Sequence, residues 1–551
     1  MAKHVAIIGA GISGLTAIKQ CLDNELIPIC FEQNSFIGGI WRYEDVCEKN
    51  NEPYSSIYKG VLTNTSKEMT TFSDFQIPAD WPIYMNHSLI EKYIDMYAEH
   101  FNLLPHIKFN TTVLKISILP DNRWKVKYII QSESEEKEEI FDFVMVCSGH
   151  RKPKWPEFKG MNLFKGEQLH SYKYKRAIDF ENKRVLVVGC GNSALDIAVE
   201  LTYSASQVYL GIRREKLPWI VPRFINGKAL DHSVSRFSAY IPLSIKGGIL
   251  ENHIIKTFPF PSHLMPTDPL ISTYFAINSE IYQCLAAGTV IVKPSIKEFK
   301  SENNQIEFVD GTFLENIDVV IYSTGYYIDY PFLEKHIYIG GDEIEQEYGN
   351  EFHDLVWLYR SIFPPKYPNI AFIGLELGAG STSSMSEMQA RYAASLFKGF
   401  TKPLPSQNEM EKSIREYYKS IRKNYCKSDR SAIRLSYIPY MDTLSKEIGC
   451  YPCSYEIIKK FGFKFWKLII FGMATPIQYR LLGRNSWEGA KEAISLYNKY
   501  SFKATARESR GYKSWIYILI ILLILLNRNA ETAIIFMKEK AESYYKIREI
   551  D

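Results

Sequence analysis

Two glycine-rich turns, each lying between a short apolar run and a helix-like pattern, constrain this chain more than any other feature. The first lies in "HVAIIGAGISGLTAIKQ" at residues 4–20, and the second in "KRVLVVGCGNSALDIAVE" at residues 183–200. An apolar strand, a turn of the form GxGxxG or GxGxxA and a helix start are typical of a dinucleotide-binding βαβ unit. The sequence therefore predicts two turns that each bind a pyrophosphate.

The first turn carries each residue that this fingerprint requires. Gly9 permits the sharp turn, Gly11 lets the backbone approach a pyrophosphate, and Gly14 lets the helix pack on the strand. A second apolar run, "IPICFE", ends in Glu32, where a carboxylate can accept hydrogen bonds from ribose hydroxyls. We expect the dinucleotide to bind at Gly9, Ala10, Gly11, Ile12, Ser13, Gly14 and Glu32.

The second turn has the same form but a different partner for the ribose. The strand that follows it leads into Arg213 and Arg214, at the place where a carboxylate would otherwise stand. Guanidinium groups bind a ribose 2′-phosphate bidentately, so the pattern favours NADP, although two solvated arginines after a strand are the alternative. The predicted NADP contacts are Gly189, Gly191, Asn192, Ser193, Ala194, Leu195, Asp196, Arg213 and Arg214.

The similarity between the two halves extends beyond the turns. Each half ends in an apolar strand followed by a small residue and glycine, "FDFVMVCSGH" at 141–150 and "IDVVIYSTGY" at 317–326. Short alternating strands precede both endings. We interpret this as an internal duplication and predict an α/β fold with two Rossmann-type domains, one binding a flavin dinucleotide and one a nicotinamide. Two such cofactors in one protein allow a hydride to pass between them.

Several stretches together resemble one known family. "FKGEQLHSYKY" at 164–174 fits the pattern FxGxxxHxxxY/F through Phe164, Gly166, His170 and Tyr174. Similar stretches are "GGIW" at 38–41, "LTNTSKEMTTFSDF" at 62–75, "STGY" at 323–326 and "SEMQAR" at 386–391. On these residues the chain resembles the flavin-containing monooxygenases over roughly residues 3–500. Related Baeyer–Villiger enzymes usually end the first pattern differently, so Tyr174 favours the former family.

The resemblance implies roles for particular residues. Asn64 aligns with the asparagine near the reactive carbon of the flavin, where a neutral amide can donate a hydrogen bond without supplying a proton. The alternative for this stretch is a plain turn. His170 is expected to link the two domains and orient NADP rather than transfer a proton. Further cofactor contacts are implied for Gly39, Ile40, Trp41, Thr63, Thr65 and Gly325.

The resemblance also implies a reaction. NADPH reduces FAD, dioxygen adds to form a flavin C4a-hydroperoxide, and this species oxygenates soft nitrogen- or sulfur-containing small molecules, as in xenobiotic metabolism. The protein contributes an apolar, water-poor pocket, so that no metal ion or nucleophilic side chain is required. The alternatives are a Baeyer–Villiger monooxygenase acting on ketones, a membrane-bound NADPH oxidase or reductase, and a dinucleotide-binding protein without turnover. A disulfide reductase would need Cys450 and Cys453 beside the flavin.

The predicted domains follow from these turns and, for the part after residue 330, from the resemblance. They are a flavin-binding part at 1–153, an NADP-binding part at 154–330, a return to the flavin domain at 331–445, a helical region at 446–510 and a tail at 511–551. An insert at about 214–288, rich in proline and aromatic residues, is too long for one βα connection. It is expected to border the active site or touch lipid, with Glu280 as a candidate substrate contact.

The tail is expected to associate with a membrane. Trp515 to Leu526 form twelve unbroken apolar residues, whereas a full span needs about 20. This predicts either an interfacial anchor or a span extended by flanking residues. Lys and Arg residues before it favour a cytosolic upstream side. With the resemblance, this gives the endoplasmic reticulum membrane, with the catalytic domains facing the cytosol. The stretch 465–476 either dips into the membrane or packs as a helix.

Composition excludes other classes. With 66 basic and 62 acidic residues the net charge is only +4, which argues against a nucleic-acid partner. Nine scattered cysteines favour a reducing compartment, and no cluster has metal-ligand spacing, so no metal site is predicted. The oligomeric state stays open, a homo-oligomer included.

Overall fold

The computed structural model of the chain describes residues 2–45, 53–149, 152–258, 260–349, 352, 355–375, 377–425 and 433–503. The chain divides into two compact units, residues 1–500 and 501–551. Both predicted dinucleotide turns lie in the first unit, whereas the apolar tail predicted to meet a membrane lies outside the described residues. Among the helices that are described, none is both long and apolar enough to cross a membrane.

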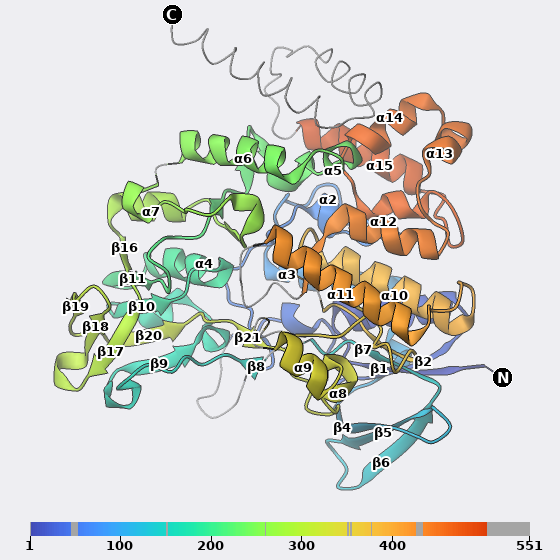
Figure 1. Ribbon diagram of the computed structural model, residues 1–551, viewed down its shortest axis with the longest axis horizontal. Helices are drawn as coiled ribbons and strands as arrows, with labels where there is room; N and C mark the ends of the chain where they lie inside the picture. Colours follow the sequence, from blue (N-terminus) through green and yellow to red (C-terminus); the bar gives the residue numbers. More distant parts are fainter. Residues whose placement is uncertain are drawn as a thin grey trace, which may run out of the picture. The chain divides into compact units, whose positions relative to one another are not determined.

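The first Rossmann-type sheet is parallel throughout and is centred on β1 (His4–Ile8). Four of the five residues of β1 are buried, as expected for a strand covered on both faces by helices. Helix α1 (Ile12–Asp23) begins directly after the first glycine turn (Figure 1). The strands run in the order β22 (Ile370–Phe372), β7 (Phe143–Val146), β1, β2 (Ile27–Phe31) and β3 (Ile107–Lys108).

The second sheet repeats this arrangement around β10 (Arg184–Val188). It too is parallel, and helix α4 (Asn192–Leu201) follows the second glycine turn. Its strand order is β16 (Val290–Lys293), β11 (Gln207–Gly211), β10, β20 (Val319–Tyr322) and β9 (Glu167–His170). In the first sheet, β1 lies between β2 and β7. In the second sheet, β10 lies in the same way between β11 and β20. The predicted pair of Rossmann-type folds is therefore confirmed.

A small antiparallel sheet accompanies each parallel sheet, as the alternating sequence pattern predicts. In the first half it consists of β4 (Thr111–Ile118), β5 (Trp124–Ile130) and β6 (Glu136–Phe141). In the second half it consists of β17 (Ile296–Lys300), β18 (Gln305–Phe308) and β19 (Phe313–Leu314). Each small sheet comes directly before the strand that closes its half, β7 in the first and β20 in the second, which supports the interpretation as an internal duplication.

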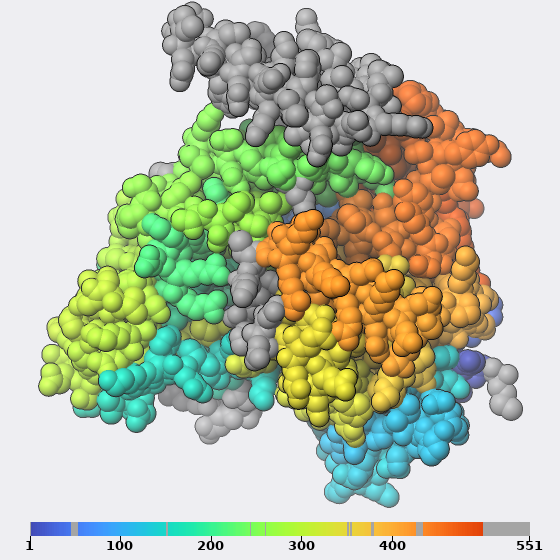
Figure 2. All heavy atoms as spheres, in the orientation of Figure 1, coloured from blue at the N-terminus to red at the C-terminus, as the bar shows by residue number. Residues whose placement is uncertain are grey.

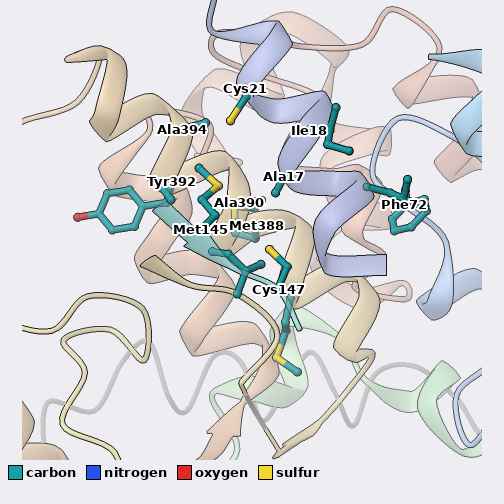
Figure 3. Close-up of a cluster of buried hydrophobic side chains, with 14 of the residues drawn as sticks. Ala17, Ile18, Cys21, Phe72, Met145, Cys147, Met388, Ala390, Tyr392 and Ala394 are labelled. Carbon is teal, nitrogen blue, oxygen red and sulfur yellow. The ribbon is translucent and has the colours of Figure 1, made fainter. Parts of the chain in front are cut away.

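Helix α10 (Thr382–Lys398) covers the first sheet beside α1, although more than 350 residues separate them (Figure 3). Ala17 and Cys21 of α1 and Ala390 of α10 are fully buried, and such small side chains let two helices approach closely. Met145 and Cys147 of the first sheet complete this core. The segment after residue 331 thus returns to the first sheet through both β22 and α10.

The insert and the C-terminal helices pack on each other. Helix α5 (Arg236–Ala239) contacts α12 (Tyr437–Glu447) and α14 (Phe463–Phe471). In Figure 2 the green atoms of the insert adjoin the orange atoms of these helices. The contact is partly ionic, because the buried Arg236 donates from Nη1 to Asp442 Oδ1 at 2.8 Å. The insert also contains β12 (Ile220–Val221), β13 (Phe224–Ile225), β14 (Lys228–Ala229), α6 (Leu243–Thr257), β15 (Ala276–Ile277) and α7 (Ile281–Ala287).

The stretch 465–476 forms a packed helix, one of the two alternatives that its apolar sequence allowed. Phe465 and Ile469 of α14 are buried in a core shared with α13 (Ser454–Phe461) and α15 (Ala490–Lys503). The remaining helices and strands are α2 (Lys67–Thr70), α3 (His87–His100), β8 (Lys152–Pro153), β21 (Tyr326–Tyr327), α8 (His336–Ile339), α9 (Asp342–Tyr348), β23 (Leu377–Ala379), α11 (Gln407–Asn424) and β24 (Arg434–Ser436). The boundaries between the five segments expected from the sequence stay predictions, since residues 1–500 form one unit.

Candidate flavin and nicotinamide site

The first glycine turn, here called the first cradle (residues 9–14), forms a surface made of backbone. Gly9 has a φ of +97°, and a Cβ on Gly14 would lie 1.8 Å from the Gly9 carbonyl oxygen, so neither position accepts a side chain. Gly11 faces Gly39 of the adjoining loop, whose own Cβ would lie 3.0 Å from Gly11 Cα. No side chain caps the N-terminus of α1. Its N–H groups are thus free to bind a pyrophosphate.

Glu32 stands at the end of β2, beside the first cradle, as predicted. Its Oε2 accepts a hydrogen bond from the Ala10 amide at 2.7 Å, and its Oε1 accepts from the backbone and side chain of Asn34, both at 2.9 Å. Ser13 lies against the returning chain, because a Cβ on Gly374 would be 2.3 Å from Ser13 Oγ. A fixed carboxylate next to an uncapped helix N-terminus fits the ribose and pyrophosphate of FAD.

The second glycine turn, here called the second cradle (residues 189–194), leaves an open space. Gly189 has a φ of +129°, and a Cβ there would lie 2.5 Å from the Ser323 carbonyl oxygen. A Cβ on Gly191, by contrast, would meet no atom within 4 Å. Ala194 is fully buried, and no side chain caps α4. Gly191 has an extended φ of −83°, so backbone strain does not explain why a glycine stands here. The open space beside it does, because that space lets a pyrophosphate approach the backbone.

Arg213 and Arg214 follow β11 and are exposed, at the position that the sequence predicts. Burial raises the pKa of the Cys190 thiol to about 11, and the positive charges of both arginines oppose that shift. The two guanidinium groups therefore act on the second cradle, of which Cys190 is a part. Arg214 Nη1 also lies 3.8 Å from Asp268 Oδ2 in the insert. This placement suits recognition of a ribose 2′-phosphate.

Replacing both arginines, Arg213→Ala with Arg214→Ala, is expected to weaken NADPH while leaving NADH nearly unchanged. A hydrogen bond to a charged group contributes about 1.5–3 kcal/mol, so the KM for NADPH should rise about ten- to a hundredfold or more. Initial rates of cofactor oxidation measured with each nucleotide check this. Equal weakening of NADPH and NADH would contradict the phosphate contact.

One loop, residues 55–65, runs from the first cradle to the second. Ser55 Oγ donates to the Ile40 carbonyl at 2.5 Å, within the loop 38–41 that faces the first cradle. Tyr58 donates its hydroxyl to Asp196 Oδ2 on α4 at 3.0 Å. A Cβ on Gly60 would lie 2.8 Å from Glu200 Oε1 at the end of the same helix. The loop therefore contacts the surroundings of both cradles before the chain reaches Thr63, Asn64 and Thr65.

Asn64 is half-buried and meets a residue of the insert that the sequence did not single out. Arg223 donates from Nη2 to Asn64 Oδ1 at 3.2 Å and from Nε to the Thr63 carbonyl at 3.5 Å. The same guanidinium lies 3.8 Å from Asp196 Oδ2. Asp196, predicted to contact NADP, thus has both carboxylate oxygens engaged, since Asn278 donates to Oδ1 at 2.6 Å. Its predicted role in binding NADP stays a prediction.

The motif at 164–174 connects the second sheet with the loop 55–65. Phe164 is buried, and Gly166 leaves no room for a side chain, because its Cβ would lie 2.5 Å from the Asp318 carbonyl. His170 is fully buried, with Nε2 3.0 Å from the Gly325 carbonyl. Tyr174 donates to Glu200 Oε2 at 2.9 Å, beside Gly60. The contact of His170 with Gly325 lies within the second half, so its expected linking role stays a prediction.

Burial lowers the pKa of His170 from 6.5 to about 4, and this predicts a loss of stability in acid. The unfolded chain binds a proton near pH 6.5, whereas the folded chain resists it until about pH 4, so stability falls as the pH drops through that window. Between pH 7 and pH 5 the loss amounts to about 2 kcal/mol. A His170→Gln variant should lack this component in urea titrations at the two pH values. An unchanged pH dependence in the variant would contradict the shift.

Two further predicted groups lie away from the cradles. Glu280 is exposed at the start of α7, although its charge helps raise the pKa of the half-buried Asp196, a shift due mainly to desolvation. Its role toward substrate stays a prediction. Cys450 is buried beside α10, and both Cys450 and Cys453 are free thiols. Over the described ranges, no group of three or more His, Cys, Asp or Glu side chains could hold a metal ion.

The structure contains two parallel sheets whose central strands have the same order, and a dinucleotide cradle follows the central strand of each. The loop 55–65 connects the two parts. This arrangement defines a flavin- and nicotinamide-dependent oxidoreductase. The family model described as flavin-binding monooxygenase-like matches residues 2–530. Flavin-containing monooxygenase 5 of Rattus norvegicus is 37% identical over 511 residues, which cover 89% of this chain and 91% of that protein. Dimethylaniline monooxygenase (N-oxide-forming) 2 of the same species is 37% identical over 513 residues, covering 90% and 91%. The chain belongs to the flavin-binding monooxygenase-like family.

Solved structures share the fold. S-allyl-L-cysteine S-oxygenase from Allium sativum superposes with a TM-score of 0.62 at 22% identity, covering 92% of this chain and 99% of that one. OTEMO, solved in complex with FAD and NADP, has a TM-score of 0.61 at 16% identity, covering 81% and 97%. The chain is thus a flavin-dependent monooxygenase that uses FAD and NADPH, and both cradles fit these cofactors.

Proposed function

We propose that this protein oxygenates soft nitrogen- or sulfur-containing small molecules, using NADPH and dioxygen, and that it thereby serves in xenobiotic metabolism. The observation that carries the proposal is the loop 55–65, which contacts the loop 38–41 facing the first cradle and helix α4 after the second cradle, and which carries the neutral Asn64. The name of one relative describes N-oxide formation, and that of one structural neighbour describes S-oxygenation. Among the described residues, no group of three metal-ligating side chains offers a different chemistry.

The side chains of this site bind and orient rather than react. The first cradle and Glu32 would hold FAD, and the second cradle with Arg213 and Arg214 would hold NADPH. When bound, the two cofactors supply the hydride and the site at which dioxygen is activated. Asn64 can donate hydrogen bonds from its amide but has no acidic proton to release. A site that excludes water when substrate and cofactors are bound would favour oxygen transfer to substrate over release of hydrogen peroxide.

Product analysis tests the proposal directly. The full-length protein with FAD and NADPH should convert a thioether to its sulfoxide and a tertiary amine to its N-oxide. A simple ketone should yield little or no ester. Ester as the main product would favour the Baeyer–Villiger alternative. NADPH oxidation that yields hydrogen peroxide alone with every substrate would favour an oxidase.

We also propose that the tail associates with the endoplasmic reticulum membrane, with the catalytic part facing the cytosol. Twelve apolar residues at 515–526, preceded by lysines and arginines, support this. A second support comes from α13 and α14, where Tyr455 is 72% and Phe463 54% exposed beside Lys464 and Lys467. Aromatic and basic side chains together favour a lipid headgroup region.

A flotation assay with phospholipid vesicles tests the membrane proposal. The full-length protein should float with the vesicles, and Leu522→Asp with Leu523→Asp should leave most of it in the soluble fraction. The matched control, Leu522→Ala with Leu523→Ala, should float like the original protein. Equal flotation of the Asp variant would contradict a role for the tail.

A further inference from the structure

Two parts of the insert hold the segment that contains Asn64. Arg223, in the turn between β12 and β13, contacts Thr63 and Asn64. Asp231 accepts a hydrogen bond at Oδ2 from the Ser66 amide at 2.7 Å. The next residue, His232, lies with Nε2 3.2 Å from Glu68 Oε2, and both side chains are buried. The insert therefore contributes residues to the site that contains Asn64 and does not only border it.

Arg223 is fixed at its backbone and at its side chain. Its amide donates to Ser279 Oγ at 3.0 Å, and its carbonyl accepts from the Tyr84 hydroxyl. The side chain is 8% exposed, so its charge is shielded from water and must be balanced nearby. Asp196 Oδ2, at 3.8 Å, provides that balance from α4 of the second cradle. Arg223 thus joins the insert, the loop 55–65 and the NADP-binding half.

The chemistry of a guanidinium determines which end of the Asn64 amide faces it. Arginine carries only donors, so the partner atom must be the acceptor Oδ1 and cannot be the NH₂ group. In the part of the chain that the structure describes, the bond from Arg223 Nη2 is the only hydrogen bond of the Asn64 side chain. The two N–H donors of Asn64 are left for a ligand. If the oxygen and the NH₂ group of the Asn64 amide changed places, N–H donors of Asn64 would face N–H donors of Arg223.

We infer that Arg223 is a positioning residue that presents Asn64 as a hydrogen-bond donor to the bound cofactors, and that Asp196 ties this orientation to the NADP-binding half. The inference rests on the proposed function, in which Asn64 lies beside the flavin. The backbone around Asn64 has anchors besides Arg223. Thr63 donates to the Met85 carbonyl at 2.9 Å, and Ser66 is held by Asp231. Loss of the guanidinium should therefore turn the amide without unfolding the loop.

Arg223→Lys is the variant to test first, because it keeps a positive charge beside Asp196 but lacks the planar fork of donors. The quantity measured is the ratio of sulfoxide formed to NADPH consumed by the full-length enzyme with FAD, with hydrogen peroxide measured in parallel. We expect this ratio to fall about tenfold or more, as for loss of a charge-assisted hydrogen bond. Flavin content and unfolding midpoint should stay close to those of the original protein. Arg223→Gln, which loses the charge as well, should fall further.

A double-mutant cycle separates positioning from a general structural role. If Arg223 acts through Asn64, Arg223→Lys should change the ratio little in an Asn64→Ala background. Equal effects in both backgrounds would overturn the inference. Arg123→Lys, at an arginine about half exposed and paired with Asp121, is the matched control and should leave the ratio unchanged. A complete lack of sulfoxide from the unmodified enzyme would instead refute the proposed function itself.

Discussion

Gly191→Val should leave a protein that retains FAD but is reduced by NADPH far more slowly than the original protein. Any L-residue can adopt the backbone conformation of Gly191, and a Cβ there meets no protein atom within 4 Å. The valine side chain would therefore occupy the space left for the pyrophosphate. Losing two charge-assisted hydrogen bonds to phosphate, at about 1.5–3 kcal/mol each, weakens binding about 10²- to 10⁴-fold.

Anaerobic reduction of the flavin, followed by absorbance, measures this effect. NADPH should bleach the Gly191→Val flavin only at concentrations raised by that factor, whereas dithionite should bleach it normally. The matched control is Gly248→Val in α6, where a Cβ also meets no atom within 4 Å. This control should behave like the original protein. Reduction of Gly191→Val at the original NADPH concentration would show that the second cradle does not hold the nucleotide.

Arg480→Met should lower the free energy of unfolding by about 3–5 kcal/mol, because it leaves buried carboxylates without their cation. Arg480 is 1% exposed, and its Nη2 forms an ion pair with Asp74 Oδ2 at 2.7 Å and donates a hydrogen bond to Glu387 Oε1 at 3.0 Å. Its Nε donates to Ser73 Oγ at 2.7 Å. Lys19 also pairs with Asp74, at 2.6 Å, whereas Arg480 is the cation that pairs with Glu387. Most of the decrease in the free energy of unfolding should therefore come from Glu387, which is left without its cation.

Thermal unfolding of the holoenzyme, followed by the release of flavin fluorescence, measures the change. Arg123→Met is the matched control, since Arg123 Nε lies 2.7 Å from Asp121 Oδ2 with both side chains about half exposed. An exposed pair contributes about 0–1 kcal/mol, so this variant should unfold near the original midpoint. Equal midpoints for the two variants would show that the buried cluster around Arg480 does not stabilise the fold.

Much of the fold could be predicted because its determinants are local. The turn at Gly9 and the turn at Gly189 need glycine for reasons that hold within a few residues, and the buried strands beside them are continuous apolar runs. The return of the chain to the first sheet was predicted from the resemblance alone. No local pattern marks β22, which has three residues and pairs with β7. Such a pairing depends on contacts that are distant in sequence.

The candidate site divides in the same way. The cradles, Glu32 and the two arginines after β11 lie where spacing along the chain placed them. Arg223 gave no signal, because a single arginine in a proline-rich insert belongs to no motif. Its significance depends on Asn64, 159 residues away, and on Asp196 in a different half. Asp196 itself was assigned to NADP from its place after the turn, although its carboxylate faces the insert and Tyr58.

The buried thiols of the core around α1 affect how long the enzyme stays active while it releases oxidants. Cys21, Cys30 and Cys147 are buried, and burial raises the pKa of each thiol well above its ordinary value. Oxidants attack the thiolate, and these groups stay protonated and out of solvent reach. Hydrogen peroxide that escapes during idle cycles should therefore spare them. These three thiols in the flavin-binding half should therefore resist oxidation by the peroxide that the enzyme itself releases.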